Sequence, residues 1–223
     1  MTGYGIKLKV FGEFGCFTRP ELKVERVSYD VMTPSAARGI LEAIHWKPAI
    51  RWVIDAIHVL EPIQFTNIRR NEVGKKIPAN TVKAAAKRGD LEGLSLLVDE
   101  ERQQRASLVL VKPAYVIDAH FEMTPKAGEG DNPRKHLEIF TRRAEKGQCF
   151  HQPCLGTREF AANFELIASP DQMPLAIGES RDLGFMLFDL DHSQAGAPPM
   201  FFRAQMVDGV VSVPHPSSQE ILR

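Results

Sequence analysis

The chain has 223 residues, with 28 lysines and arginines against 28 aspartates and glutamates, so its formal net charge at pH 7 is zero. Hydrophobic residues make up 43% and charged residues 25%, which is typical of a folded globular protein and excludes a disordered or fibrous chain. No apolar run reaches the roughly 18–20 residues of a membrane helix, and the polar start is unlike a signal peptide. Three cysteines are too few for a disulfide framework, so we expect a cytoplasmic protein without membrane association.

The zero net charge is the sum of two oppositely charged parts of the chain. Residues 165–223 carry three cations and eight anions, a net charge of −5, and residues 1–164 therefore carry +5. Seven cations and one glutamate fall within residues 66–89, and a second basic cluster spans residues 134–146. Because basic patches attract polyanions whatever the net charge, the neutral total does not exclude nucleic acid. A solvated, lysine-rich surface is the alternative interpretation.

The first part of the chain predicts a strand, a helix and a second strand. Hydrophobic residues alternate over residues 4–10 and again over 50–60, a pattern typical of half-buried strands. Between them, Thr33 and Pro34 supply a capping hydroxyl and a first-turn proline for a helix, which Pro48 ends.

Residues 63–105 interrupt this pattern. They are polar and basic, and we interpret them as an insertion that has no strand pattern and forms helices near 80–88 and 91–98.

After the insertion the alternation of strand and helix resumes. A strand is predicted over 114–123, a helix over 134–146 with Gly147 as its C-cap, and a strand over 157–166. The order β-α-β, insertion, β-α-β is that of the split βαβ unit, so we predict an α+β, ferredoxin-like (RRM-like) fold with a basic insertion.

The acidic end of the chain predicts a small antiparallel β module. Residues 183–190 and 200–213 have strand patterns, and Asp208-Gly209 is a hairpin turn signal. We therefore expect two units, a ferredoxin-like domain over 1–166 and a C-terminal β module over 167–223 that faces protein or solvent.

Two histidines and a lysine are the candidate catalytic groups. His45 stands at the end of the first predicted helix, where an imidazolium is favoured, and Lys135-His136 opens the later helix. In a ferredoxin-like fold both helices pack on one sheet face, so these two ends can share a cleft. Such groups can cleave RNA without a metal: one takes the proton of the ribose 2′-OH, another protonates the leaving 5′ oxygen, and lysine stabilises the added charge. The product carries a 2′,3′-cyclic phosphate; a basic surface turn is the alternative interpretation.

A metal site is the other chemistry considered. Cys149, His151 and Cys154 fall within six residues, and His192 could join them. Structural zinc usually takes four ligands in paired spacing, and no second pair is present, so we interpret this segment as a loop.

Short segments along the whole chain stand in an order specific to one protein family. These segments are Phe11-Gly12, Phe17-Thr18-Arg19-Pro20, Val27-Ser28-Tyr29, Pro34–Ile44, Trp46-Lys47-Pro48, Arg134-Lys135-His136 and Leu155-Gly156-Thr157-Arg158-Glu159. Together they resemble the CRISPR-associated endoribonuclease of subtype I-C, the d branch of the fifth Cas family, in the RAMP superfamily of ferredoxin-like RNA-binding proteins.

The resemblance implies cutting of precursor CRISPR RNA at the base of the repeat hairpin and retention of the 5′ handle within the Cascade surveillance complex. It also implies a catalytic set of a tyrosine, a lysine and a histidine, of which Lys135 and His136 match directly. His45 stands where the family has the tyrosine. An imidazole with a pKa of about 6.5 is a better base at neutral pH than a phenol near 10, so activity is compatible with this difference.

The expected partners are CRISPR repeat RNA or the crRNA 5′ handle, and the backbone and large subunits of Cascade; no metal or other cofactor is expected. Weak, salt-sensitive binding of duplex DNA is also expected. The cations predicted to contact RNA are Arg19, Arg38, Lys47, Arg69, Arg70, Lys75, Lys76, Arg134 and Arg142.

Two other functions stay open at the level of sequence. A catalytically silent subunit that caps the 5′ handle would carry the same basic patches. A dedicated DNA-binding protein would need an exposed recognition helix, and the sequence predicts none.

Overall fold

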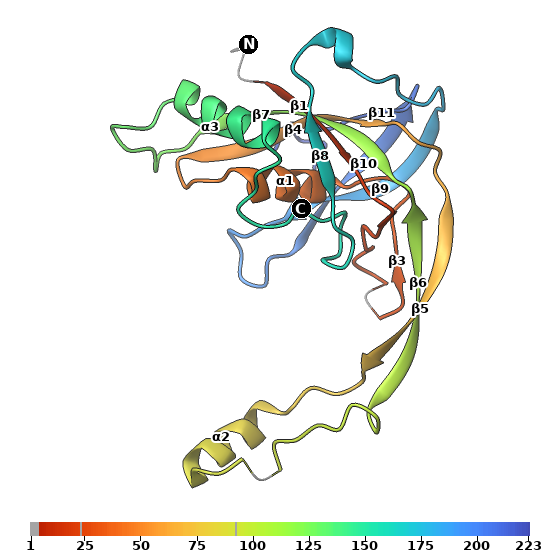
Figure 1. Cartoon of the computed structure of the whole chain (residues 1–223), viewed down its shortest axis with the longest axis vertical. Helices are drawn as coiled ribbons and strands as arrows, with labels where there is room; N and C mark the ends of the chain where they lie inside the picture. The colour runs from red at the N-terminus through yellow and green to blue at the C-terminus, as the bar shows by residue number, and fades with distance from the viewer. Residues whose placement is uncertain (1–4, 23, 92) are drawn as a thin grey trace.

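A computed structural model describes residues 5–22, 24–91 and 93–223 and has a mixed α+β architecture (Figure 1). Its larger sheet has seven strands in the order β8-β1-β7-β4-β11-β10-β9, and each neighbouring pair is antiparallel. The strands are β1 (Ile6–Phe11), β4 (Ile50–Val59), β7 (Ala114–Met123), β8 (Asn163–Leu166), β9 (Arg181–Leu190), β10 (Pro199–Val207) and β11 (Val210–Ser212).

The predicted strands of the first part are confirmed where the structure describes them. β1 alternates buried and half-buried residues along its length, as the sequence pattern of 4–10 predicted, although Tyr4 lies outside the described residues. The strand predicted over 157–166 is shorter than expected, since β8 begins only at Asn163.

Two helices begin with the same device, a polar cap followed by proline. In α1 (Pro34–Ile44), the Thr33 hydroxyl accepts a hydrogen bond from the Ala36 N–H at 3.3 Å. In α3 (Pro133–Glu145), the Asn132 side chain accepts one from the Lys135 N–H at 2.9 Å. Each cap satisfies a backbone donor that the helix itself leaves unpaired, which fixes where the helix begins. Both predicted helices are confirmed.

Aromatic packing holds the two helices on the sheet. The Trp52 ring on β4 lies 5.3 Å from Phe121 on β7 and 4.9 Å from Phe140 on α3, measured between ring centroids. The Trp52 indole N–H also donates to the His45 carbonyl oxygen at 2.9 Å. This hydrogen bond satisfies the only polar atom of a buried indole and fixes His45, the residue that caps the end of α1, against the sheet.

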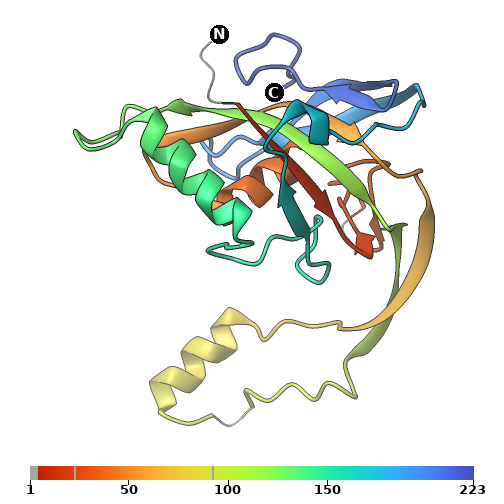
Figure 2. The same cartoon turned by 45° about the horizontal axis from the view of Figure 1, so that its top comes forward.

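The insertion forms an arm that projects from the body, with a helix near its far end (Figures 1 and 2). It consists of β5 (Phe65–Val73), α2 (Ala79–Arg88) and β6 (Arg102–Val111), and β6 also pairs with two short strands, β2 (Phe14–Gly15) and β3 (Arg26–Val27).

The prediction that the insertion lacks strands is wrong. β5 has no buried residue, so polar side chains occupy both of its faces and the hydrophobic alternation that reveals a strand is missing. The helix predicted over 80–88 is confirmed by α2. The one predicted over 91–98 is wrong for its described part, and Glu92 lies outside the described residues.

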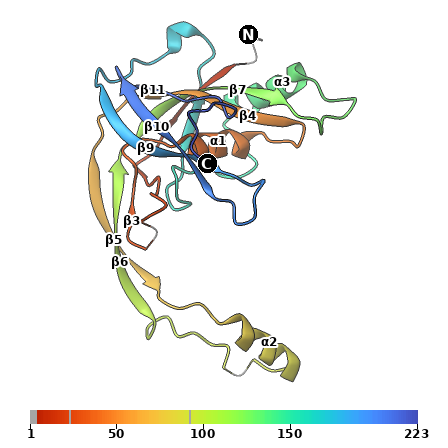
Figure 3. The same ribbon diagram turned by 180° about the vertical axis from the view of Figure 1, so that it is seen from behind.

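The acidic C-terminal strands extend the larger sheet rather than forming a second one. Their hairpin turn is confirmed: Asp208 and Gly209 have φ values of 48° and 75°, as the tight turn of a hairpin requires. Viewed from behind, β9, β10 and β11 lie together on one side of the molecule (Figure 3). β11 pairs with β4, which joins them to the rest of the sheet. Among the described residues, no helix is long and apolar enough to cross a membrane.

Candidate functional site

The structure brings together the two histidines on which the catalytic prediction rests. His45 follows the last turn of α1 and His136 lies in the first turn of α3. The His45 Nε2 atom lies 3.0 Å from the His136 Nδ1 atom, which is a hydrogen bond between the two rings. Both residues are 1% exposed. The ends of the two helices therefore meet in a buried imidazole pair.

A carboxylate at the other side of His136 indicates the tautomers of the pair. The Asp131 Oδ1 atom lies 3.3 Å from the His136 Nε2 atom, outside hydrogen-bond geometry, and the negative charge of this carboxylate favours a proton at that nitrogen. A neutral His136 then has a lone pair at Nδ1, and His45 must donate from Nε2. His45 in turn keeps its own lone pair at Nδ1, a buried atom without a hydrogen-bond partner among the described residues. The contacts therefore run from Asp131 to His136 to His45, and the Nδ1 atom of His45 at their end can accept a further hydrogen bond.

Burial keeps both rings uncharged at neutral pH. It lowers the pKa of His45 to about 4, and the electrostatic interactions of His45 with His136, Arg143 and Lys47 act in the same direction. Burial also lowers the pKa of His136, although the Asp131 carboxylate opposes this shift. The expectation that the end of the helix favours an imidazolium at position 45 is wrong, because the loss of water outweighs the helix dipole.

Lys135 lies at the exposed edge of the same site. Its ammonium donates to the Gly130 carbonyl oxygen at 3.0 Å and to the Asp131 carboxylate at 3.1 Å. Asp131 thus contacts both the lysine and His136. Hydrogen bonds from the Gly128 N–H and from Lys135 lower the pKa of this carboxyl, so it is ionised.

Sequence reasoning missed Asp131. The available signal was its place in Gly130-Asp131-Asn132, directly before the capped helix that carries the lysine and the histidine. A carboxylate one turn before Lys135 and His136 is within reach of both side chains.

Two of the cations predicted to contact RNA are engaged in the body of the protein. Arg38 donates to Asp189 at 2.9 Å and to Glu42 at 2.6 Å, which ties α1 to β9. Arg19 donates to Asp30 at 3.2 Å. These contacts give both arginines a structural role.

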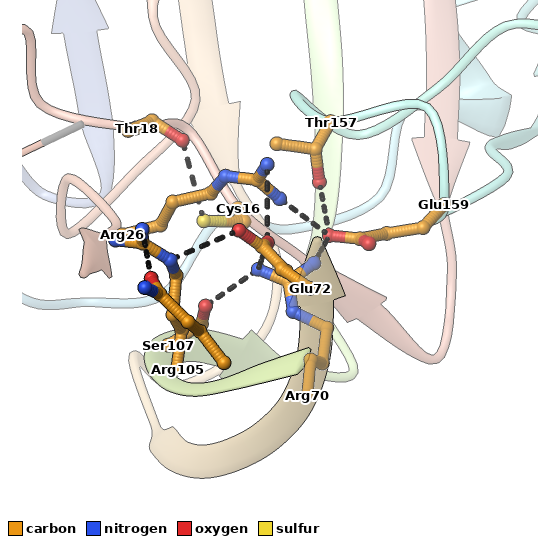
Figure 4. A network of polar contacts seen from close by, with 10 residues as sticks. Cys16, Thr18, Arg26, Arg70, Glu72, Arg105, Ser107, Thr157 and Glu159 are labelled. Atoms are coloured by element: carbon orange, nitrogen blue, oxygen red, sulfur yellow. Dashed lines mark hydrogen bonds and ion pairs between the residues drawn. The ribbon is translucent and has the colours of Figure 1, made fainter. Parts of the chain in front are cut away.

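A third predicted cation belongs to a polar network at the base of the arm (Figure 4). Arg70 on β5 donates to Glu159 in the loop before β8 and also lies 3.9 Å from Glu72. Arg26 on β3 lies 3.5 Å from each of these two carboxylates, and Arg105 on β6 lies 3.5 Å from Glu72. Three arginines and two glutamates therefore join the arm to the body.

The remaining predicted cations lie on the surface. Lys75 pairs with Glu101 across the arm, and Arg134 donates to Glu138 along α3 at 2.7 Å. Both cations are exposed, and so are Lys47 beside the histidine pair, Arg69 and Lys76 on the arm, and Arg142 on α3.

The loop interpretation of the cysteine-rich segment agrees with its packing. Cys149 and Cys154 are free thiols, and the His151 ring packs edge-on against Phe150, with centroids 4.5 Å apart. Across the described part of the chain, no three histidine, cysteine or acidic side chains are grouped closely enough to hold a metal ion.

Comparison with known proteins first gives the class. A solved structure titled "Crystal Structure of CRISPR-associated Protein" has the same fold, with a TM-score of 0.71 at 21% identity over 98% of this chain and 96% of that one. The Cas_Cas5d family model, described as CRISPR-associated protein (Cas_Cas5), matches residues 5–214. The chain belongs to the Cas5d family, and the resemblance found in the sequence is confirmed.

Two curated relatives carry the same name, "CRISPR pre-crRNA endoribonuclease Cas5d". The one from Mannheimia succiniciproducens is 56% identical over 222 residues, covering 98% of both chains. The one from Thermus thermophilus is 42% identical over 236 residues, covering 98% of this chain and 95% of the relative. The similarity therefore runs from end to end.

Proposed function

We propose that the protein is a pre-crRNA endoribonuclease that cuts precursor CRISPR RNA within its repeat and retains the 5′ handle as a subunit of a Cascade-type complex. The observation that carries this proposal is the end-to-end identity of 56% with a relative of that name. The group formed by His45, His136 and Lys135 supports it, because it offers acid–base chemistry and positive charge at one place.

The strand order supports a ferredoxin-like core of the kind that binds RNA in RRM domains. The strands β8, β1, β7 and β4 are adjacent and antiparallel, and α1 and α3 make the two crossovers of a split βαβ unit. We assign residues 1–166 to this core with its arm, and 167–223 to a C-terminal module that lengthens its sheet.

His45 is the proposed general base. Its free Nδ1 lone pair accepts the proton of the ribose 2′-OH, and the 2′ oxygen then forms a bond to the adjacent phosphorus while the bond from phosphorus to the 5′ oxygen breaks. The products are a 2′,3′-cyclic phosphate and a 5′-OH. His136 and Asp131 are positioning residues. The Asp131 carboxylate favours one tautomer of His136, and His136 in turn fixes the tautomer of His45. The negative charge of Asp131 also stabilises the imidazolium that forms when His45 takes up the proton.

Lys135 is the proposed partner on the other side of the phosphorus. The 3.0 Å hydrogen bond between the two histidines leaves no room for a phosphate between them, so they act together on one side. The Lys135 ammonium stabilises the charge of the phosphorane and supplies the proton that the leaving 5′ oxygen takes up.

RNA binding must also adjust the pair. Both rings are buried, so the substrate reaches His45 only when neighbouring groups move aside. A bound phosphodiester offsets the positive charges of Lys47 and Arg143, which raises the pKa of His45 from its low value in the free protein.

Cleavage assays with a repeat RNA test the proposal. We expect cutting in excess EDTA, a cyclic phosphate on the product, and no cutting when the nucleotide before the cut has a 2′-deoxyribose. A requirement for magnesium, or cutting of the deoxy substrate, would contradict the mechanism.

A second candidate is a catalytically silent subunit that caps the 5′ handle. The burial of both histidines and the histidine at the family's tyrosine position favour it. Stable binding of uncut repeat RNA, with no product at any pH from 6 to 9, would replace the first proposal by this one. In either case we propose that the protein is cytoplasmic, in agreement with its three free thiols. We also propose that its basic surface binds duplex DNA weakly.

A further inference from the structure

A wide groove runs beside the histidine pair. Its volume is about 1220 Å³, and it lies between α1 with the segment that follows it and the loop after α3. The residues that give it its chemistry are Trp46, Lys47, Arg143, Phe150 and Arg158. Its size exceeds the upper end of about 1,000 Å³ for small-molecule pockets, so a longer ligand suits it better.

Two large aromatic side chains in this groove face solvent. Trp46 is 52% exposed and Phe150 is 77% exposed. The backbone around Phe150 is nevertheless fixed, because the N–H groups of Phe150 and His151 donate to the Ala43 carbonyl oxygen at 2.7 and 3.2 Å. Exposed aromatic rings on a fixed backbone are the platforms on which nucleobases stack.

The charge of the groove favours an anionic ligand. Its cations are Lys47, Arg143 and Arg158, and its one carboxylate, Glu42, already accepts a hydrogen bond from Arg38 at 2.6 Å. A protein partner with an apolar or basic surface would meet uncompensated cations here. A phosphate backbone would neutralise them and release counterions.

The groove is lined by the residues that directly follow His45 in the chain. Trp46 and Lys47 follow His45 directly, and the Arg143 guanidinium donates to the Ile44 carbonyl oxygen at 2.8 Å. A nucleotide chain in the groove therefore passes the end of α1 where His45 lies.

We propose that this groove binds single-stranded RNA next to the cleavage point, with one base stacked on Trp46 and another on Phe150 and with Lys47, Arg143 and Arg158 along the phosphates. The inference rests on the proposed function. It adds that the groove binds a particular part of the substrate, the unpaired nucleotides that flank the repeat hairpin. Stacking accepts any base, so the groove contributes affinity and position rather than sequence recognition.

Fluorescence and binding measurements test this inference on the full-length protein. The probe is a repeat RNA with a 2′-deoxy nucleotide at the cut, so that binding does not depend on cleavage. The chain has two tryptophans, and because Trp52 is buried, quenching on titration reports on Trp46. We expect quenching in the wild type and its loss in Trp46→Phe, which keeps a stacking ring. Trp46→Ala and Phe150→Ala should each raise Kd about tenfold.

The matched control is Phe185→Ala on β9, a phenylalanine of 55% exposure outside the groove, which should bind as the wild type does. No quenching in the wild type, together with unchanged affinity in Trp46→Ala and Phe150→Ala, would overturn the inference. RNA binding that is intact in these variants while co-purification with other complex subunits is lost would also overturn it. Cleavage of unmodified RNA is scored separately. If the wild type binds RNA tightly, the groove variants weaken that binding and no RNA is cut, only the proposed function is contradicted. If Trp46→Ala and Phe150→Ala cut normally and bind with unchanged affinity, only the proposed role of the groove is contradicted.

Discussion

The Nε2 atom of His45 lies 3.0 Å from the Nδ1 atom of His136, so two residues expected to act as separate base and acid are hydrogen-bonded to each other. Neutral imidazoles can share a hydrogen bond in this way, but two imidazoliums cannot, because each would present only donors. Protonation of the pair is therefore coupled to its geometry, and the low pKa of His45 has consequences for stability as well as for catalysis.

The first prediction concerns stability against pH. The pKa of His45 is about 4 in the folded protein and about 6.5 when unfolded, so between these values the unfolded state binds more protons. Stability is then full above pH 6.5 and falls as the pH drops towards 4. From pH 7 to pH 5 this residue should remove about 2 kcal/mol from the free energy of unfolding.

Urea denaturation of the wild type and of His45→Gln at both pH values measures this. The variant should lose less stability on acidification than the wild type. The free energy of unfolding of the variant should still decrease somewhat between pH 7 and pH 5, since burial also lowers the pKa of His136 and His58. Equal falls in the two proteins would show that His45 titrates normally.

The second prediction assigns roles within the catalytic group. His45→Ala should reduce the single-turnover cleavage rate by 10²–10⁴-fold, the contribution of a general base. Asp131→Asn should leave RNA affinity within about twofold but lower the rate and move the acidic limb of its pH profile, because the charge that stabilises the imidazolium is lost. Added imidazole should rescue His45→Ala and not His136→Ala. Rescue of the opposite variant would make His136 the base.

Local patterns predicted the parts of this fold whose hydrophobic residues recur at a regular spacing. β1 alternates buried and half-buried residues, β7 has hydrophobic residues at every second position from Tyr115 to Phe121, and α1 and α3 begin at a cap and a proline, so each could be predicted from its own segment. β5 could not, because it rests on β6 alone and buries none of its side chains. The meeting of His45 with His136 followed from topology, whereas the pKa of His45 is set by burial among residues far apart in the sequence.

The third prediction concerns Gly156, whose backbone lies against that of Cys16. Its φ is 87°, and a Cβ there would be 2.0 Å from the Cys16 carbonyl oxygen, so Gly156→Ala must displace backbone. We expect a loss of at least about 1–3 kcal/mol, the usual cost of such strain. Gly39 is the matched control: it lies inside α1 with open space around it, and Gly39→Ala should stabilise by about 0.5–1 kcal/mol. Thermal unfolding of both variants decides, and a neutral Gly156→Ala would contradict the close approach.

The fourth prediction separates two roles for neighbouring arginines on the arm. Arg70 joins the arm to Glu159 on the body, whereas Arg69 is exposed. Removing Arg70 leaves two half-buried glutamates with fewer partners, so the base of the arm should open more often. Hydrogen exchange across β5 and β6 should therefore be faster in Arg70→Ala and unchanged in Arg69→Ala. RNA affinity in Arg69→Ala should fall modestly, and less at high salt, as expected for a phosphate contact. Equal exchange in the two variants would mean that the network in Figure 4 does not hold the arm in place.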